Sequence, residues 1–118
     1  DWYLPSRDEQ EVAYRNLKPT TTANSTNSNR GDGVANGVND NSSPAGAAYS
    51  AGNPAQTSAA AFITGTGAQA FAAASYWTST QSSVSATGAW SQSMSNGGQT
   101  TSSKNGAANV RAMRKVAT

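Results

Sequence analysis

The fold of this chain is decided by the stretch AWSQSMSNG, residues 89–97. Its larger side chains, Trp90, Gln92 and Met94, stand at every second position, and serines fill the positions between them. Side chains of a strand point alternately to opposite faces, so this spacing predicts a strand over 89–95 with one buried face. The Asn-Gly pair at its end indicates that the chain then turns back.

A hairpin is predicted from this turn. Asn96-Gly97 is the typical sequence of a tight type I′ turn, whose two central residues both need a positive φ. We expect the return strand over 99–103, and Asn105-Gly106 marks a second turn after it. The hairpin forms the centre of a small antiparallel sheet.

Two further strands are predicted for this sheet. Tyr76–Thr80 is rich in aromatic and β-branched residues, which favour strands. Val110–Val116 is the expected last strand, with Val110, Ala112 and Val116 on one face.

One helix is predicted over 6–17. Ser6 and Glu9 have the spacing of a capping box, in which each side chain accepts a hydrogen bond from the other residue's backbone amide. Apolar residues at helical spacing supply a stripe for the core, namely Val12, Ala13 and Leu17, with Tyr14 beside them. Pro19 marks the end of the helix.

The region between the helix and the sheet holds few large apolar residues. Residues 19–60 are of low complexity and predict one long polar loop. Ala68–Ala74 predicts a short helix, because alanine has the highest helix propensity.

Composition bounds the class of protein. Ala, Ser, Thr, Gly and Asn account for 74 of the 118 residues, whereas Leu, Ile, Val and Phe together number 11. The core must therefore depend on the aromatic side chains, which bury much area each. The chain has no cysteine and no histidine, which excludes disulfides, zinc sites built on these residues and catalysis by them. The longest apolar runs have five residues, far short of the ~20 of a membrane span.

Four motifs stand in order along the chain: Asp-Trp-x-Leu-Pro-Ser from Asp1, Tyr-Trp-x-Ser-Thr from Tyr76, Ala-Trp-x-Gln-Ser-x-Ser-Asn-Gly from Ala89 and Val-Arg-x-x-Arg from Val110. In this order the chain resembles the Lcl C-terminal-domain family, whose fold is related to the C-type lectin and sulfatase-modifying-factor folds. Similar modules occur in phage structural proteins and in bacterial surface proteins and adhesins. The resemblance covers residues 1–17 and 75–116, whereas residues 19–60 match nothing in it.

The resemblance implies a single C-type-lectin-like α+β domain over residues 1–118, with one N-terminal helix, a small antiparallel sheet and long loops. It implies a core formed by Trp2, Leu4, Tyr76, Trp77, Trp90, Val110, Arg111 and Arg114. Family members usually carry further chain before the first motif, so we expect this chain to be the C-terminal part of a longer protein. The acidic residue that usually follows the second motif is Gln81 here.

The long polar loop is the predicted contact region. Loops on a rigid scaffold can change their contacts without changing the fold, and Asn and Tyr suit adaptable polar recognition. The residues that we expect to contact a ligand are Asn29, Arg30, Asp32, Asn39 and Tyr49.

Two more specific interpretations of this loop stay open. The tripeptide Arg30-Gly31-Asp32 is either an integrin-type ligand or a glycine-rich turn. The oxygen-bearing residues Asp32, Asn36, Asn39 and Asp40 are either cation ligands or a polar turn, but the spacing of an EF-hand is missing. We therefore predict no metal and no cofactor.

The aromatic and basic motif residues also have two interpretations. Trp77 and Trp90 either pack in the core or stack on sugar rings, and the same holds for Trp2 and Tyr3; we expect the core. Arg111, Arg114 and Lys115 either bind anionic groups or help to build the fold. Three positive charges are too few for a nucleic-acid-binding surface, so no nucleic acid is predicted as a partner.

The functional prediction is a non-catalytic protein, because no nucleophile has a recognisable base beside it. We expect a virion structural or display protein of a bacteriophage, on the virion surface as a capsid decoration or a tail-fibre or tip module. Its expected partners are other virion proteins or further copies of itself as a homo-oligomer, and a cell-surface glycan or receptor. The alternatives are a bacterial surface adhesin that binds glycans, and an architectural domain that fills gaps between virion subunits.

Overall fold

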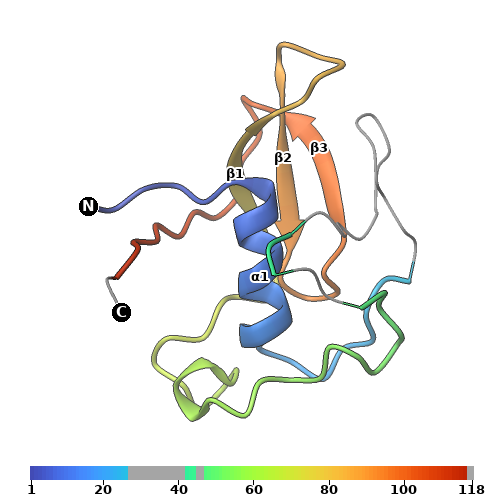
Figure 1. Cartoon of the computed structure of the whole chain (residues 1–118), viewed down its shortest axis with the longest axis vertical. Helices are drawn as coiled ribbons and strands as arrows, with labels where there is room; N and C mark the ends of the chain where they lie inside the picture. Colours follow the sequence, from blue (N-terminus) through green and yellow to red (C-terminus); the bar gives the residue numbers. More distant parts are fainter. Residues whose placement is uncertain (27–41, 45–46, 117–118) are drawn as a thin grey trace.

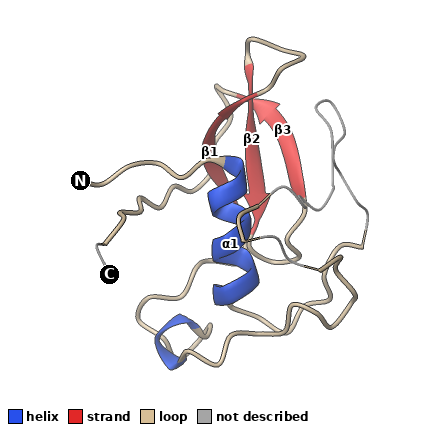
Figure 2. Ribbon diagram, viewed as in Figure 1, coloured by secondary structure: helices blue, strands red, loops and turns tan. Residues whose placement is uncertain are grey.

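One α-helix packs on one face of a three-stranded antiparallel sheet (Figures 1 and 2). The structure is a computed structural model, and it describes residues 1–26, 42–44 and 47–116. The elements are helix α1 (Arg7–Leu17), the short 3-10 helix η1 (Ala60–Phe62) and strands β1 (Ser75–Gln81), β2 (Gly88–Ser93) and β3 (Gln99–Ser103). The predicted α+β class, with one N-terminal helix, is confirmed. No helix in the described ranges has the length and apolar character needed to cross a membrane.

Helix α1 begins with the predicted capping box. The Ser6 hydroxyl accepts a hydrogen bond from the Glu9 amide at 3.2 Å, and the Glu9 carboxylate accepts one from the Ser6 amide at 3.0 Å. Ser6 is the N-cap, so the helix starts one residue later than predicted. It ends at Leu17, because Lys18 precedes Pro19 and a residue before proline disfavours the helical region.

The predicted hairpin is present, but its turn is longer than expected. Strand β3 pairs with β2 in a register that runs from Gln92–Gln99 to Gly88–Ser103. The prediction of a two-residue turn is wrong, because the longer segment Met94–Gly98 connects the two strands.

The turn packs against two tyrosine rings. Gly97 has a φ of +77°, and a Cβ at this residue would lie 2.4 Å from a ring carbon of Tyr14 and 2.7 Å from one of Tyr49. Glycine alone therefore fits at this position of the turn.

The predicted last strand over 110–116 is wrong. Asn109 forms a single parallel bridge with Tyr76, and Met113 forms a single antiparallel bridge with Tyr3. At Ser79 the outer edge of β1 is paired with the N-terminal segment, because the Ser79 amide donates to the Pro5 carbonyl at 2.9 Å. The C-terminal segment therefore cannot pair along the whole strand. The N-terminal arm (residues 1–5) and the C-terminal arm (residues 107–116) thus run side by side, as Figure 1 shows.

The predicted helix over 68–74 is also absent. A helix of this length recovers too few hydrogen bonds to offset the cost of its first turn. The chain instead forms turns, with the Gln69 amide donating to the Ala61 carbonyl at 2.8 Å.

Aromatic rings dominate the core, as the composition predicts. Its buried hydrophobic residues are Ala13, Tyr14, Tyr49, Phe71, Tyr76, Trp90 and Met94. Among the residues predicted to form the core, Tyr76 and Trp90 are buried, while Trp77 and Arg111 are half-buried.

Four residues predicted for the core lie outside it, and the prediction is corrected for each. Trp2 is 67% exposed, Val110 is 65% exposed and Leu4 is 37% exposed, and Arg114 is exposed as well. Trp2 and Leu4 alternate with half-buried Tyr3, so they face outward along the extended N-terminal arm. Val110 and Arg114 likewise flank residues of the C-terminal arm that pair or pack inward.

Arginine side chains extend the aromatic packing. Among the described residues, each of the four arginines lies over an aromatic ring: Arg7 over Trp90 at 4.3 Å, Arg15 over Tyr49 at 4.6 Å, Arg111 over Phe71 at 4.4 Å and Arg114 over Trp2 at 5.1 Å. Each distance joins the guanidinium carbon to the ring centroid. These contacts cover ring faces that scarce aliphatic side chains leave open.

Candidate functional site

A buried carboxylate on α1 joins the long loop to the sheet. The Glu11 carboxylate accepts hydrogen bonds from the Tyr49 hydroxyl at 2.7 Å, from Gln92 Nε2 at 2.7 Å and from Arg15 Nε at 2.9 Å. Glu11 and Gln92 are both fully buried. We call these four residues the Glu11 hub, and it connects the helix, the strand β2 and the chain around residue 49.

Burial controls the electrostatics of the Glu11 hub. Burial raises the pKa of the Glu11 carboxyl, while the hydrogen bond from Tyr49 and the charge of Arg15 offset part of that shift. Burial and the neighbouring carboxylate also raise the pKa of the Tyr49 hydroxyl. Tyr49 therefore stays a neutral hydrogen-bond donor at all ordinary pH values.

A second set of anchors holds the chain just before residues 27–41. The buried Asn24 accepts a hydrogen bond from the Tyr14 hydroxyl, and its Nδ2 donates to the carbonyls of Ser50 at 3.1 Å and Pro54 at 2.8 Å. These bonds fix the start of the loop to its return.

The buried Lys18 completes these anchors. Its ammonium group donates to the carbonyl of Thr22 and to that of Pro54 at 3.3 Å. Burial lowers the pKa of Lys18. The described flanks of residues 27–41 are thus held to the scaffold mainly by buried polar groups.

The predicted contact residues divide into two groups. Asn29, Arg30, Asp32 and Asn39 lie outside the described residues, as do Asn36 and Asp40 of the suggested cation loop. Tyr49 is buried in the core, 7% exposed, and its hydroxyl donates to Glu11, so the structure gives this side chain a structural contact, and its contact with a ligand stays a prediction. Over residues 1–26, 42–44 and 47–116, no three His, Cys, Asp or Glu residues gather in a way that could hold a metal ion.

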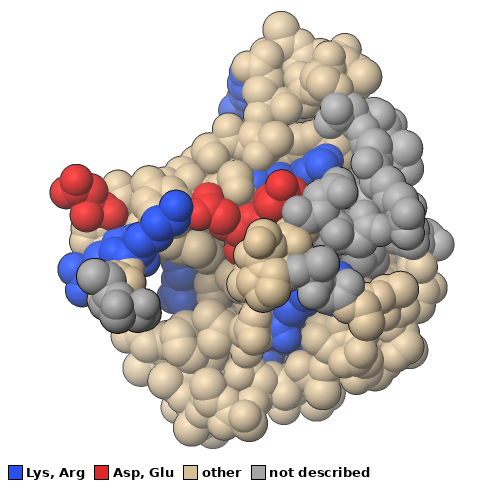
Figure 3. Space-filling view, viewed as in Figure 1, with Lys and Arg blue, Asp and Glu red and all other residues tan. Residues whose placement is uncertain are grey.

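A groove opens beside the helix, away from these anchors. It has a volume of about 620 Å³ and is bounded by α1, the segment 62–71 and the two terminal arms. Its lining residues are Trp2, Glu9, Val12, Ala13, Asn16, Leu17, Phe62, Gln69, Phe71, Arg111, Ala112, Met113 and Arg114. The space-filling view shows the hollow with both basic and acidic side chains at its margin (Figure 3).

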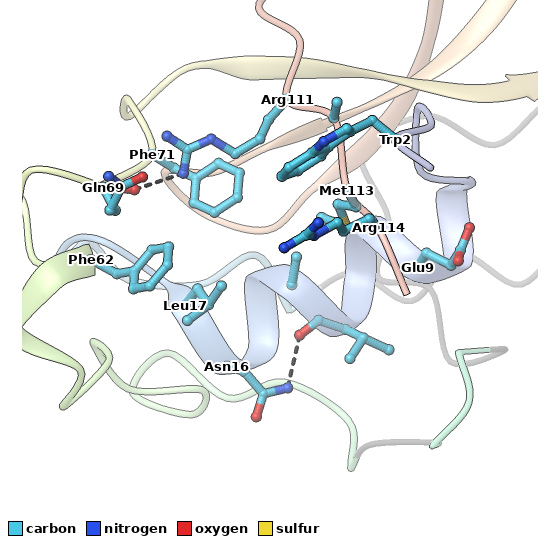
Figure 4. A pocket seen from close by; sticks show the side chains of 13 residues that line it. Trp2, Glu9, Asn16, Leu17, Phe62, Gln69, Phe71, Arg111, Met113 and Arg114 are labelled. Atoms are coloured by element: carbon cyan, nitrogen blue, oxygen red, sulfur yellow. Dashed lines mark hydrogen bonds between the residues drawn. The ribbon is translucent and has the colours of Figure 1, made fainter. Parts of the chain in front are cut away.

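The groove has an apolar floor and a charged rim. Figure 4 shows Leu17, Phe62 and Phe71 at one end and Glu9 at the other, with Arg114 between them. The Glu9 carboxylate accepts a hydrogen bond from the Tyr3 hydroxyl at 2.7 Å, which lowers its pKa and keeps it ionised.

Both arginines of the rim lie over aromatic rings. Arg111 donates from Nη1 to the Gln69 carbonyl at 2.6 Å and lies over Phe71, whereas the exposed Arg114 lies over Trp2. In the described part of the chain neither guanidinium forms an ion pair. Two cations therefore border an apolar surface.

Sequence reasoning missed both the Glu11 hub and the groove. One signal for the hub was available, because Gln92 stands between Trp90 and Met94 on the face predicted to be buried. A buried amide needs a polar partner, which Glu11 supplies. No comparable signal marks the groove, since its walls come from four separate segments.

Comparisons with known protein families, with curated proteins and with solved structures gave no match for this chain.

Proposed function

We propose that this chain is a non-catalytic structural and display module of a bacteriophage particle, either a capsid decoration or the fibre or tip domain of a tail. The proposal includes a C-type-lectin-like form of the α+β fold, a place on the virion surface, and contacts with other virion proteins or further copies of the chain. A cell-surface glycan or receptor is the proposed external partner.

The anchoring of the loop is the observation that carries this proposal. Tyr49 reaches Glu11 at 2.7 Å on one side of residues 27–41, and Asn24 bonds Tyr14 and Pro54 on the other. A display module needs such fixed ends, because the scaffold must keep its shape while the segment between them changes its contacts.

The packing of the scaffold also supports a passive role. The sheet and helix meet through Trp90, Gln92 and Tyr14, all fully buried. The Glu11 carboxylate in this core accepts three hydrogen bonds, which favours one arrangement of the helix and the sheet, while Trp90 Nε1 and Arg15 Nη2 are buried without a hydrogen-bond partner among the described residues.

A bacterial surface adhesin is the second candidate. Trp2 is 67% exposed, and an exposed indole ring is a surface on which a sugar ring can stack. Both candidates bind outside partners, but they differ in the assembly to which the chain belongs.

The test locates the chain in its native assembly. An antibody raised against the chain is used to label purified phage particles and intact bacterial cells, with pre-immune serum as the control. We expect label on the shell or the tail of particles. Label confined to the cell surface would overturn the phage proposal and favour the adhesin.

A protease comparison separates display from a purely architectural role. Cleavage between residues 19 and 60 is followed in particles and in the isolated chain. Equal cleavage in both supports an outward-facing loop, and a glycan screen then follows. Protection on the particle alone means that neighbouring subunits cover the loop.

A further inference from the structure

We infer that the groove beside α1 binds a peptide segment of a partner protein that carries a large apolar side chain next to a carboxylate. The inference goes beyond the proposed function, because it names the chemistry of one partner and holds whether the chain resides on a particle or on a cell.

The apolar floor is the first reason. Leu17, Phe62 and Met113 are half-buried side chains that pack against the core and still border the open groove. An apolar side chain that covers them gains free energy from leaving water. The volume of about 620 Å³ has room for one or two such side chains.

The charges of the rim are the second reason. Arg111 and Arg114 both face this groove, and neither has a carboxylate partner in the described ranges. The one acid of the lining, Glu9, keeps its charge while it accepts hydrogen bonds from Tyr3 and from the Ser6 amide. Two arginines against one glutamate leave the lining with a net positive charge, which favours a negatively charged partner.

Each of the two guanidinium groups lies over an aromatic ring before any partner arrives. Arg111 lies over Phe71 at 4.4 Å and uses Nη1 for the Gln69 carbonyl, which leaves its other N–H groups to donate. Arg114 lies over Trp2 at 5.1 Å and is exposed, so the edge of its guanidinium group can donate to a partner. A guanidinium edge pairs with a carboxylate through two parallel hydrogen bonds, and less side-chain entropy is lost when the group is already held. This arrangement selects carboxylates without closing the groove.

The distribution of polar atoms favours a peptide over a sugar. A glycan presents hydroxyl groups over its whole surface, and these need donors and acceptors throughout a site. Here the polar groups stand at the rim, whereas carbon atoms of Leu17, Phe62 and Phe71 line the floor (Figure 4). A side chain such as Leu or Phe, flanked by Glu or Asp, matches both parts.

The experiment titrates the full chain with four synthetic probes: acetyl-Glu-Leu-Phe-Glu-amide, its Gln and Lys analogues at both ends, and acetyl-Glu-Ser-Ser-Glu-amide. Binding is followed by the NMR shift of the Trp2 indole N–H, assigned with Trp2→Phe. We expect the Glu-Leu-Phe-Glu peptide to bind at least about tenfold more tightly than each of the other three.

Matched variants locate the binding. Arg114→Gln removes one exposed charge at the rim and is expected to weaken binding of the acidic peptide at least about fivefold. Lys104→Gln removes the same charge on another surface, where Lys104 bonds Gln81 and the Ala86 carbonyl, and is expected to leave binding unchanged. Thermal melting of each variant shows that it is folded.

Several outcomes would overturn the inference. Equal binding of the acidic and basic peptides would show that the arginines do not select charge. Equal binding to the wild type and to Arg114→Gln would place the peptide elsewhere. Binding of sialyllactose at the Trp2 signal without the peptide would make the groove a glycan site. Trp2 shifts that depend on protein concentration alone would mean that a second copy fills it.

Discussion

The Tyr49 hydroxyl and the Glu11 carboxylate lie 2.7 Å apart, and this contact joins two segments 38 residues apart in the sequence. Both groups are buried, so the hydrogen bond is shielded from water. The helix therefore holds the returning end of the loop through a carboxylate that also bonds the sheet through Gln92, and Arg15 adds a hydrogen bond to the Ala47 carbonyl at 2.7 Å.

Glu11→Ala should be among the most destabilising single changes. It leaves Tyr49, Gln92 and Arg15 without their shared acceptor, and each buried donor left unpaired costs about 1–3 kcal/mol. We expect a loss of at least about 3 kcal/mol in the free energy of unfolding, measured with urea. Gln81→Ala, at an exposed residue of β1, is the control and should change it by less than about 0.5 kcal/mol.

The pH dependence of stability should distinguish two glutamates of one helix. Burial raises the folded-state pKa of Glu11, so its contribution to stability is present below its unfolded pKa and is lost as pH rises through the folded pKa. The pKa of Glu9 is lowered, chiefly by the Tyr3 hydrogen bond, so its contribution is present above its unfolded pKa and is lost as pH falls through the folded one.

Melting curves between pH 3 and pH 8 test these signs. Relative to the wild type, Glu11→Gln should gain melting temperature as pH rises, and Glu9→Gln should lose it over the same change. Curves that run parallel to that of the wild type for both variants would contradict the prediction.

The three tryptophans should differ in their effect on stability. Trp90 is fully buried, so Trp90→Ala is expected to cost about 3–5 kcal/mol, enough to unfold a domain of ordinary stability. Trp77 is half-buried and Trp77→Ala should cost less, while Trp2→Ala at an exposed residue should cost least. Chemical denaturation gives the order, and an equal loss for Trp2 and Trp90 would contradict the packing.

Two glycines with positive φ offer a matched pair. Gly65 has a φ of +89° and open space where a Cβ would be, whereas Gly97 has a φ of +77° and the Tyr14 ring 2.4 Å from that position. Gly65→Ala should cost about 1 kcal/mol from backbone strain. Gly97→Ala should cost about 1–3 kcal/mol more, because the ring must move. Similar melting temperatures for the two variants would mean that Tyr14 gives way freely.

Local signals predicted the parts of the fold that depend on neighbours in sequence. Ser6 and Glu9 are three residues apart, so the helix start needs no distant contact, and β2 and β3 are joined by one short turn. The prediction of a strand in the C-terminal arm failed because its pairing depends on how Pro5 occupies the edge of β1 at Ser79, a contact between segments far apart in the sequence.

The candidate sites were harder to predict for a related reason. In the sequence, Glu11 is one of several acidic residues near the start of a helix. It is buried because Tyr49 and Gln92, which are distant in the sequence, pack against it. The groove likewise needs Phe62, Arg111 and Trp2 to meet beside the helix. Contacts between such distant segments depend on tertiary packing, so they cannot be predicted from local residue patterns.

The anchors at Asn24 and Tyr49 have a consequence for how this chain can evolve. Because both ends of the intervening segment are fastened by their own buried bonds, its length is decoupled from the stability of the scaffold. Doubling the length of a loop costs only about 0.6 kcal/mol in closure entropy. Insertions, deletions and wholesale exchange of the residues between these anchors should therefore be inherited without loss of the fold.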